Sequence, residues 1–192
     1  MNIAVFASHG GSNLQAIIDA CKSGKLDAKV SVVISNNSDA MALKRAESDG
    51  IPHFHYSQKV IPEPDLLDKT ILATLKEHDV QLVFLAGYLK KLGTSILKEY
   101  ENRVINVHPS LLPKYGGKGM HGINVHKAVI EAKEKETGVT IHYVNEVYDT
   151  GEIIAQKKVP VISDDTAESL AARVLKQEHI LVVEVLSHMI NG

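Results

Sequence analysis

The sequence predicts an α/β fold with one doubly wound, mostly parallel sheet and helices on both faces. Short β-branched runs alternate with longer segments of helical period through the first hundred residues. The strand-like runs are apolar almost throughout, as expected for strands that helices cover on both sides. A β-α-β-α order of this kind implies parallel strands joined by right-handed crossovers.

The boundaries of these first elements follow from the apolar runs and from the glycines that punctuate them. Gly24 and Gly50 come just after the first two helical segments, where glycine commonly ends a helix. We expect strands at 3–7, 30–35, 81–86 and 104–107, and helices at 13–21, 40–48, 64–78 and 94–100.

The last third of the chain follows a different pattern. We expect a longer, irregular β pair here, with its two strands at residues 139–145 and 153–161. A long final helix is expected to begin at 164–166, where Asp165 and Glu168 have the spacing of a capping box. Because we find no linker, repeat or low-complexity stretch, we predict a single domain over residues 1–192.

Composition narrows the class of function. The net charge is −2 with histidine neutral, and the basic residues are scattered, which argues against nucleic-acid binding. The single cysteine, Cys21, excludes an internal disulfide and favours a reducing cytosol. The longest apolar run, 82–89, is too short to span a membrane, and no signal peptide is apparent. We therefore expect a cytoplasmic protein that binds neither nucleic acid nor membrane.

A candidate anion site lies in the first loop, between strand 3–7 and helix 13–21. The loop Ser-His-Gly-Gly-Ser-Asn over 8–13 follows the carboxyl end of a strand, where open α/β sheets bind ligands. The unpaired N–H groups of a helix start attract phosphate, and Ser12 and Asn13 add side-chain donors. The loop matches neither the dinucleotide motif nor the P-loop motif. The structural alternative is a tight turn with Ser12 as the helix cap.

The segment 104–113, Val-Ile-Asn-Val-His-Pro-Ser-Leu-Leu-Pro, carries the strongest chemical signal. Asn106 and His108 share one face of the predicted strand, and Pro109 ends the strand directly after them. An amide beside an imidazole can stabilise and protonate the oxyanion that forms when an amine attacks a carbonyl. The alternatives are a histidine with only structural hydrogen bonds, or a metal ligand, for which no Cys or carboxylate cluster lies nearby.

Asp149 in the segment 148–151, Tyr-Asp-Thr-Gly, has two interpretations. Its local sequence favours a simple turn. A functional role requires Asp149 to lie against His108 across the sheet, which the local sequence does not determine.

Four segments in this order carry a family resemblance: 11–17 (Gly-Ser-Asn-Leu-Gln-Ala-Ile), 85–88 (Leu-Ala-Gly-Tyr), 106–113, and Asp149-x-Gly151. With them, the chain resembles the folate-dependent formyltransferases from end to end, in the branch that acts on glycinamide ribonucleotide. The Asn-x-His-Pro-Ser-Leu-Leu-Pro segment is highly specific for the superfamily, and Gly-Ser-Asn at 11–13 indicates the branch. The resemblance implies a Rossmann-like fold, and an enzyme of purine synthesis that transfers formyl from 10-formyltetrahydrofolate to the amine of glycinamide ribonucleotide.

The resemblance also implies the roles of individual residues. The catalytic group would be Asn106, His108 and Asp149; a charged His108 would stabilise the oxyanion, and Asp149 would raise the pKa of His108 by opposite charge. Gly11, Ser12 and Asn13 would hold the ribonucleotide phosphate, and Glu178 would contact the glycinamide portion. Formyl folate is a cosubstrate, so no metal or other cofactor is expected, and the protein would be a monomer or homodimer. The folate would lie against Leu89, Lys90, Lys91, Leu92, Leu97, Val144, Asn145, Glu146, Val147 and Tyr148.

Several positions depart from the family pattern or allow other interpretations. His9 stands where glycine is usual, Pro64 where arginine is common, and the 116–121 segment is longer than its usual counterpart. Lys90 and Lys91 could simply begin a solvated helix, and Glu178 could be a surface charge. His121, His126 and His142 are candidates for supporting roles around the site.

The rival functions are another folate-dependent formyltransferase acting on methionyl-tRNA, a formyltetrahydrofolate hydrolase, and a non-enzymatic nucleotide-binding module. The first two typically carry a further domain, which we do not expect here. A nucleotide-binding module would explain residues 11–13 but would leave Asn106 and His108 without a purpose.

Overall fold

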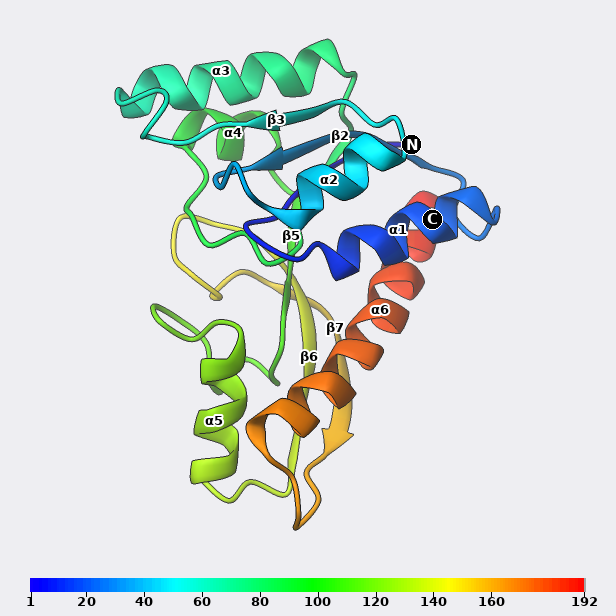
Figure 1. The fold of residues 1–192 in the computed structure, drawn as a ribbon, viewed down its shortest axis with the longest axis vertical. Coiled ribbons are helices and arrows are strands. Elements are labelled where there is room, and N and C mark those ends of the chain that lie inside the picture. The colour runs from blue at the N-terminus through cyan, green and yellow to red at the C-terminus, as the bar shows by residue number, and fades with distance from the viewer. Residues whose placement is uncertain (192) are drawn as a thin grey trace.

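The structure is a computed structural model that describes residues 1–191. Its seven strands form one sheet in the order β3-β2-β1-β4-β5-β6-β7 (Figure 1). The strands are β1 Asn2–Phe6, β2 Lys29–Ser35, β3 His53–His55, β4 Leu82–Leu85, β5 Val104–His108, β6 Glu136–Tyr143 and β7 Ile153–Pro160. The helices are α1 Ser12–Lys22, α2 Met41–Ser48, α3 Pro64–Glu77, α4 Thr94–Glu99, α5 Ile123–Glu131 and α6 Ala167–Asn191.

The sheet has a parallel part and an antiparallel part. Strands β3, β2, β1, β4 and β5 pair in parallel, whereas β6 runs antiparallel to β5 and β7 antiparallel to β6. This confirms the predicted fold class, including the C-terminal β pair and the long final helix. The strand order changes direction between β1 and β4, and open sheets bind ligands beyond the carboxyl ends of strands at such a point.

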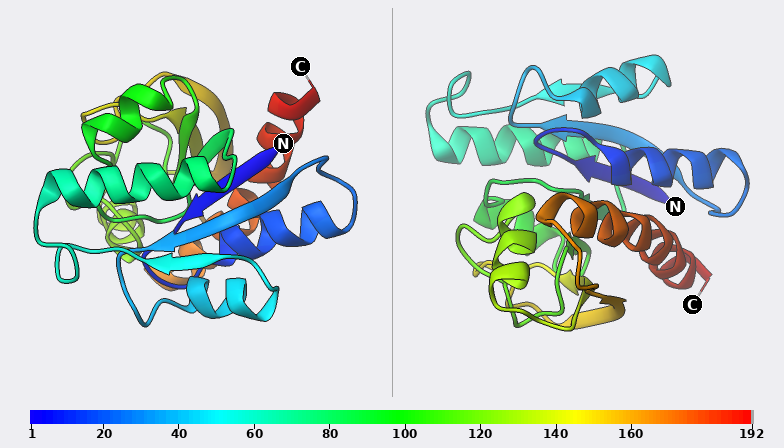
Figure 2. Two further views of the ribbon diagram at one scale, coloured as in Figure 1. Left: turned by 90° about the horizontal axis from the view of Figure 1, so that it is seen from above. Right: turned by 60° about the horizontal axis from the view of Figure 1, so that its bottom comes forward.

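Two apolar cores account for the uninterrupted hydrophobic strands. Ile3 and Val5 of β1 pack into the core beneath α1, α2, α5 and α6. Ala4 and Phe6, which alternate with them, pack into the core beneath α3 and α4. The two helix layers lie on opposite faces of the sheet (Figure 2). Because both faces are buried, strands β1 and β4 are apolar almost throughout, which is why they read as continuous apolar runs.

Two elements were not predicted. Strand β3 has only three residues and pairs at the edge with β2. Helix α5 begins after Gly122 without a side-chain cap in the described structure, and its first turn contains Ile123, Asn124 and Val125. Ile, Asn and Val are all weaker helix formers than Ala or Leu. Helix α5 is therefore stabilised by packing, with Val129 buried in the core that α6 also covers.

The start of α6 differs from the prediction by one residue. The Thr166 N–H donates to Ser169 Oγ at 3.0 Å, and the Ser169 N–H donates to Thr166 Oγ1 at 3.2 Å. Thr166 and Ser169 therefore form the reciprocal cap, and the expected pair of Asp165 and Glu168 was wrong. Asp165 instead accepts two hydrogen bonds from Arg173, at 2.6 and 2.7 Å, and this guanidinium holds the pKa of Asp165 well below its usual range. None of the helices within residues 1–191 is long and apolar enough to cross a membrane.

Candidate active site

A cavity of about 870 Å³ lies beyond the carboxyl ends of β1, β4 and β5. This volume lies within the roughly 300–1,000 Å³ that is typical of small-molecule sites. All of the site residues that the sequence predicted line this one cavity: Gly11, Ser12, Asn13, Leu89, Lys90, Lys91, Leu92, Leu97, Asn106, His108, Val144, Asn145, Glu146, Val147, Tyr148, Asp149 and Glu178.

The start of α1 forms the first wall of the cavity. Gly11 precedes the helix with φ of +69°, a left-handed conformation that glycine adopts without strain. Within residues 1–191 no side chain caps α1, so Ser12 is not the cap, and the first N–H groups of the helix remain available to a ligand. A Cβ at Gly11 would lie 2.9 Å from Cα and Cβ of Ala42, so α2 packs directly against this turn.

Asn13 and Glu178 join α1 to α6 at the same wall. Asn13 Nδ2 donates a hydrogen bond of 2.6 Å to Glu178 Oε2, and both side chains are buried. Burial raises the pKa of Glu178, and the hydrogen bond from Asn13 opposes this. The alternative of a solvated surface charge is therefore wrong for Glu178. A buried carboxylate beside a ligand cavity can pair with a cationic or hydrogen-bond-donating group of the ligand.

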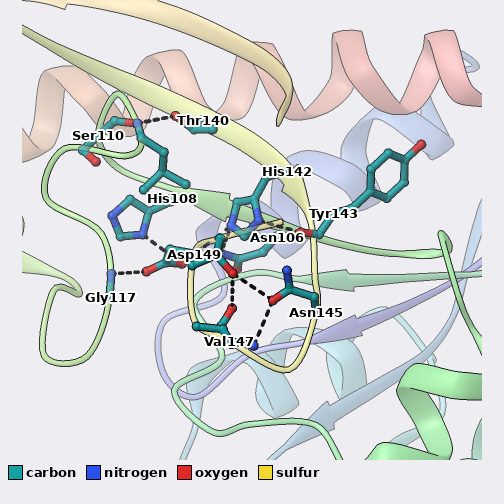
Figure 3. Close-up of polar contacts among 12 residues, drawn as sticks. Asn106, His108, Ser110, Gly117, Thr140, His142, Tyr143, Asn145, Val147 and Asp149 are labelled. Atoms are coloured by element: carbon teal, nitrogen blue, oxygen red, sulfur yellow. Dashed lines mark hydrogen bonds and ion pairs between the residues drawn. The ribbon is translucent and has the colours of Figure 1, made fainter. Parts of the chain in front are cut away.

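The second wall is a polar cluster around Asp149. Strand β5 supplies Asn106 and His108, and the neighbouring strand β6 supplies His142, opposite Asn106. Asp149 Oδ1 lies 3.6 Å from His108 Nδ1 and 3.6 Å from His142 Nε2 (Figure 3). Its Oδ2 accepts a hydrogen bond of 2.8 Å from the Gly117 N–H. The tertiary structure thus brings Asp149 to His108, as the resemblance implied.

The hydrogen bonds define which ring nitrogens carry protons. His108 Nε2 lies 2.7 Å from the Tyr115 carbonyl oxygen, and His142 Nδ1 lies 2.7 Å from that of Tyr143. A carbonyl oxygen only accepts, so these two nitrogens donate. In the neutral rings His108 Nδ1 and His142 Nε2 therefore carry lone pairs, and Asn106 Nδ2 donates to the latter at 3.1 Å. Lone pairs of both imidazoles and of Asp149 Oδ1 converge, so the cluster is well placed to take up a proton.

Burial has the largest effect on the pKa of His108 in the free protein. It lowers the pKa of His108, and the opposing charge of Asp149 compensates only in part. Asp149 therefore acts on the pKa of His108 in the expected direction, but burial outweighs it in the free protein. Burial acts to raise the pKa of Asp149, but the imidazoles of His142 and His108 and the Gly117 N–H hold it below its ordinary value. The resting cluster is thus a carboxylate beside a largely neutral imidazole.

The loop 144–149 connects this cluster to the outer end of the cavity. Asn145 Oδ1 accepts hydrogen bonds from the Val147 N–H at 2.8 Å and from Thr150 Oγ1 at 3.1 Å. Lys91 Nζ donates to the Glu146 carbonyl at 2.9 Å and lies 5.1 Å from the centre of the Tyr148 ring. Lys91 therefore joins the segment 89–92 to this loop, and neither Lys90 nor Lys91 begins a helix, since α4 starts at Thr94.

The comparisons with known proteins agree with this geometry. The family model described as "Formyl transferase" matches residues 1–186. The chain belongs to the formyl transferase family.

Several relatives share one name within this family. Phosphoribosylglycinamide formyltransferase of Escherichia coli is 37% identical over 192 residues, covering 100% of this chain and 88% of the relative. The chloroplastic enzyme of that name from Vigna unguiculata is 45% identical over 96% of this chain, which spans 59% of the relative's length. The crystal structure of the Bacillus halodurans protein of that name matches with a TM-score of 0.92, 36% identity, and coverage of 100% of this chain and 96% of the other. These relatives carry the name of the branch that the sequence resembles.

In this formyl transferase some residues around the site escaped the sequence analysis. Thr140 is fully buried, donates to the Ser110 carbonyl at 2.6 Å and accepts from the Leu112 N–H at 3.1 Å. It thereby holds the turn that follows His108, in which the Leu112–Pro113 peptide is cis. Its position two residues before His142, on the same face of β6, was the available signal.

The other histidines that the sequence analysis named lie around the cavity. His126 is buried at its wall, and burial lowers its pKa, whereas His121 and His9 line the cavity as exposed residues. Pro64 begins α3. Within residues 1–191, no three His, Cys, Asp or Glu side chains are grouped so that they could hold a metal ion.

Proposed function

We propose that this chain transfers the formyl group of 10-formyltetrahydrofolate to the amine of glycinamide ribonucleotide, a step of purine synthesis. One observation carries the proposal: an uncapped helix start, a proton-accepting cluster and a long, mainly apolar recess share one cavity. The relatives' names support the same reaction, although the chain spans less than two thirds of the length of some of them.

The ribonucleotide would occupy the wall formed by α1 and α6. Gly11, Ser12 and Asn13 would bind its phosphate, because the N–H groups of a helix start complement a dianion. Glu178 would face the glycinamide portion from α6 and orient its amine. The carboxylate is buried and bonded to Asn13, so phosphate and amine would be located by two neighbouring side chains.

The folate would occupy the opposite wall. Leu89, Leu92 and Leu97 line this part of the cavity together with the loop of residues 144–148. The fused ring of the pterin suits such walls, because apolar contact and stacking favour a flat aromatic group. Lys90 would remain available to the glutamate carboxylates, whereas Lys91 is already bonded to the loop. The formyl group would then lie near Asn106 and His108, between the ribonucleotide and the folate.

The proposed reaction moves one proton and one formyl group. The amine nitrogen attacks the formyl carbon, a C–N bond forms, and the carbonyl oxygen becomes an oxyanion. The second N–H of Asn106 Nδ2 donates to this oxygen. The neutral His108, with Asp149 beside it, takes the proton that the amine loses, and the resulting imidazolium stabilises the oxyanion. The carbonyl then re-forms, the bond to N10 of the folate breaks, and His108 delivers the proton to N10.

The rival with structural support is hydrolysis of formyl folate. A formyltetrahydrofolate deformylase from Pseudomonas syringae matches with a TM-score of 0.87 and 26% identity, and the chain covers 61% of it. A hydrolase needs a water in place of the amine and has no use for a phosphate site. The uncapped start of α1 and the buried Asn13–Glu178 pair therefore favour the transferase.

An absorbance assay of folate deformylation separates these functions. The chain is mixed with 10-formyltetrahydrofolate alone, with glycinamide ribonucleotide, or with methionyl-tRNA, each in the absence and presence of EDTA. We expect turnover only with the ribonucleotide, and the formylated product by mass spectrometry.

Turnover without ribonucleotide would establish the hydrolase, and turnover with methionyl-tRNA alone would establish the methionyl-tRNA formyltransferase. Binding without turnover would support the nucleotide-binding module. Activity that EDTA abolishes and zinc alone restores would contradict the metal-free chemistry.

We also propose that residues 1–192 act as one formyltransferase domain in the cytoplasm, as a monomer or homodimer. Light scattering on a sizing column would measure the assembly state, and a larger assembly would contradict it.

A further inference from the structure

The phosphate loop, residues 8–13, has three consecutive carbonyl groups that are each bonded away from the cavity. The His9 carbonyl accepts from the Ala42 N–H of α2 at 3.0 Å. The Gly10 carbonyl accepts from Arg45 Nε at 2.9 Å. The Gly11 carbonyl accepts from the Gln15 N–H of α1 at 3.0 Å. Two of these donors are backbone N–H groups, and the third belongs to the side chain of Arg45.

The direction of a carbonyl determines the direction of the next N–H. In a trans peptide the C=O of one residue and the N–H of the following residue point to opposite sides of the plane. Arg45 holds the Gly10 carbonyl, and it thereby directs the Gly11 N–H away from α2. A phosphate bound at the start of α1 needs N–H groups directed to it and the partially negative carbonyl oxygens directed elsewhere.

The guanidinium also contacts only uncharged groups in the described structure. Arg45 Nη1 donates to the neutral amide of Gln15 at 3.0 Å, and Gln15 in turn donates to Asp19 at 2.9 Å. Within residues 1–191, no carboxylate lies within ion-pair distance of Arg45. A half-buried cation that contacts the loop without a countercharge favours a dianion on the other side of that loop.

We propose that Arg45 is a positioning residue for the ribonucleotide phosphate. It fixes the Gly10–Gly11 peptide from outside the cavity and adds positive charge behind the helix start. The inference rests on the proposed function, because it concerns the phosphate of the proposed substrate. It differs from a purely structural link between α1 and α2 in one respect: its effect depends on the phosphate of the ligand.

A comparison of two substrates tests the proposal. Arg45→Met removes the bond and the charge, Arg45→Lys keeps the charge but loses the forked geometry, and Lys44→Met changes an exposed cation on the same helix. Steady-state kinetics are measured with glycinamide ribonucleotide and with the riboside that lacks the phosphate. Melting temperatures are recorded for each variant.

We expect Arg45→Met to raise the ribonucleotide KM by roughly ten- to hundredfold, as when a hydrogen bond to a charged group is lost. Its kcat should stay within about threefold, and kcat/KM for the riboside should be unchanged, because the contact acts through the phosphate. Arg45→Lys should give an intermediate KM, and Lys44→Met should match the wild type. Equal losses for both substrates, or an unchanged ribonucleotide KM, would overturn the proposal.

Calorimetry keeps the inference separate from the proposed activity. Ribose 5-phosphate and ribose are titrated into the wild type and each variant, without folate. We expect the wild type to bind the phosphate sugar more tightly than ribose, and Arg45→Met to lose most of this difference. If the wild type lacks transferase activity but shows this pattern, the proposed function fails and the role of Arg45 stands. If phosphate adds nothing to wild-type binding, the role of Arg45 fails as well.

Discussion

The two walls of the cavity are built in different ways. The phosphate loop 8–13 is short, and the backbone supplies most of its geometry: a left-handed Gly11, bonded carbonyls and a helix start. The cluster around Asp149 depends on side chains that are far apart in sequence, since Asp149 is 41 residues from His108. The phosphate loop itself joins β1 and α1, two elements that are adjacent in the sequence. The second wall exists only after β5 and β6 pair and the loop 144–149 closes over them.

The two walls also differ in what they do with charge. At the phosphate loop, the N-terminus of α1 carries the partial positive charge of a helix start. This charge would attract a dianion without any proton transfer. The cluster around Asp149 instead contains groups that can exchange a proton: burial lowers the pKa of His108, and the carboxylate opposes that effect only in part. Changes in the first wall should therefore appear in KM, and changes in the second wall in kcat and its pH dependence.

The largest expected effect is the loss of the catalytic pair. His108→Ala and Asp149→Ala should each lower kcat by about 10²–10³-fold, because each removes part of the group that handles one proton and one oxyanion. The double variant should cost little more than the worse single variant, since the two residues act together. Steady-state kinetics measure all three, with His53→Ala as a control for loss of an exposed histidine. Losses that multiply would separate Asp149 from His108 in the mechanism.

A second prediction compares two adjacent glycines of the phosphate loop. Gly11→Ala should lower the free energy of unfolding by about 1–3 kcal/mol, because a left-handed conformation and contact with Ala42 both oppose a Cβ. Gly10→Ala should change it by less than about 0.5 kcal/mol, since no atom lies within 4 Å of its Cβ position. Urea unfolding gives both values. Equal values for the two variants would mean that the loop relaxes freely and is not held by α2.

The third prediction concerns pH. Asp149→Asn removes the carboxylate that raises the pKa of His108 and leaves the burial that lowers it. The pKa of His108 should therefore fall further, and the acidic limb of the kcat–pH profile should move to lower pH while kcat itself decreases. Asparagine tolerates the φ of +57° at this position and can still accept from the Gly117 N–H. A limb that stays in place, or moves to higher pH, would remove His108 from the titration.

The smallest expected effect is at the outer loop. Lys91→Met removes the contacts to the Glu146 carbonyl and the Tyr148 ring, which are exposed and together amount to about 1 kcal/mol. The folate KM should rise about two- to fivefold and the ribonucleotide KM should not change. Lys98→Met on α4 is the matched control, since it removes an exposed lysine elsewhere. A rise in the ribonucleotide KM of similar size would show that the two walls are not independent.

The sequence alone determined the parts that depend on neighbours along the chain. Apolar runs and helical spacing indicated the parallel strands and their helices, because burial on both sheet faces leaves a periodic pattern in the residues themselves. The same holds for the helix stops at Gly24 and Gly50, both of which have positive φ. The short elements β3 and α5 were missed because their residues carry weak local preferences, and packing forms them.

Within the site, the strand face shared by Asn106 and His108 could be predicted from the alternation of side chains along β5. Family resemblance was needed to propose Asp149 as their partner, because local sequence at Asp149 indicates only a turn. Tertiary structure decided the rest: Asp149 between two imidazoles, Glu178 buried against Asn13, and Arg45 bonded to the Gly10 carbonyl. It also decided the charge of His108, since a pKa depends on burial and on every charge nearby, and neither is determined until the chain has folded.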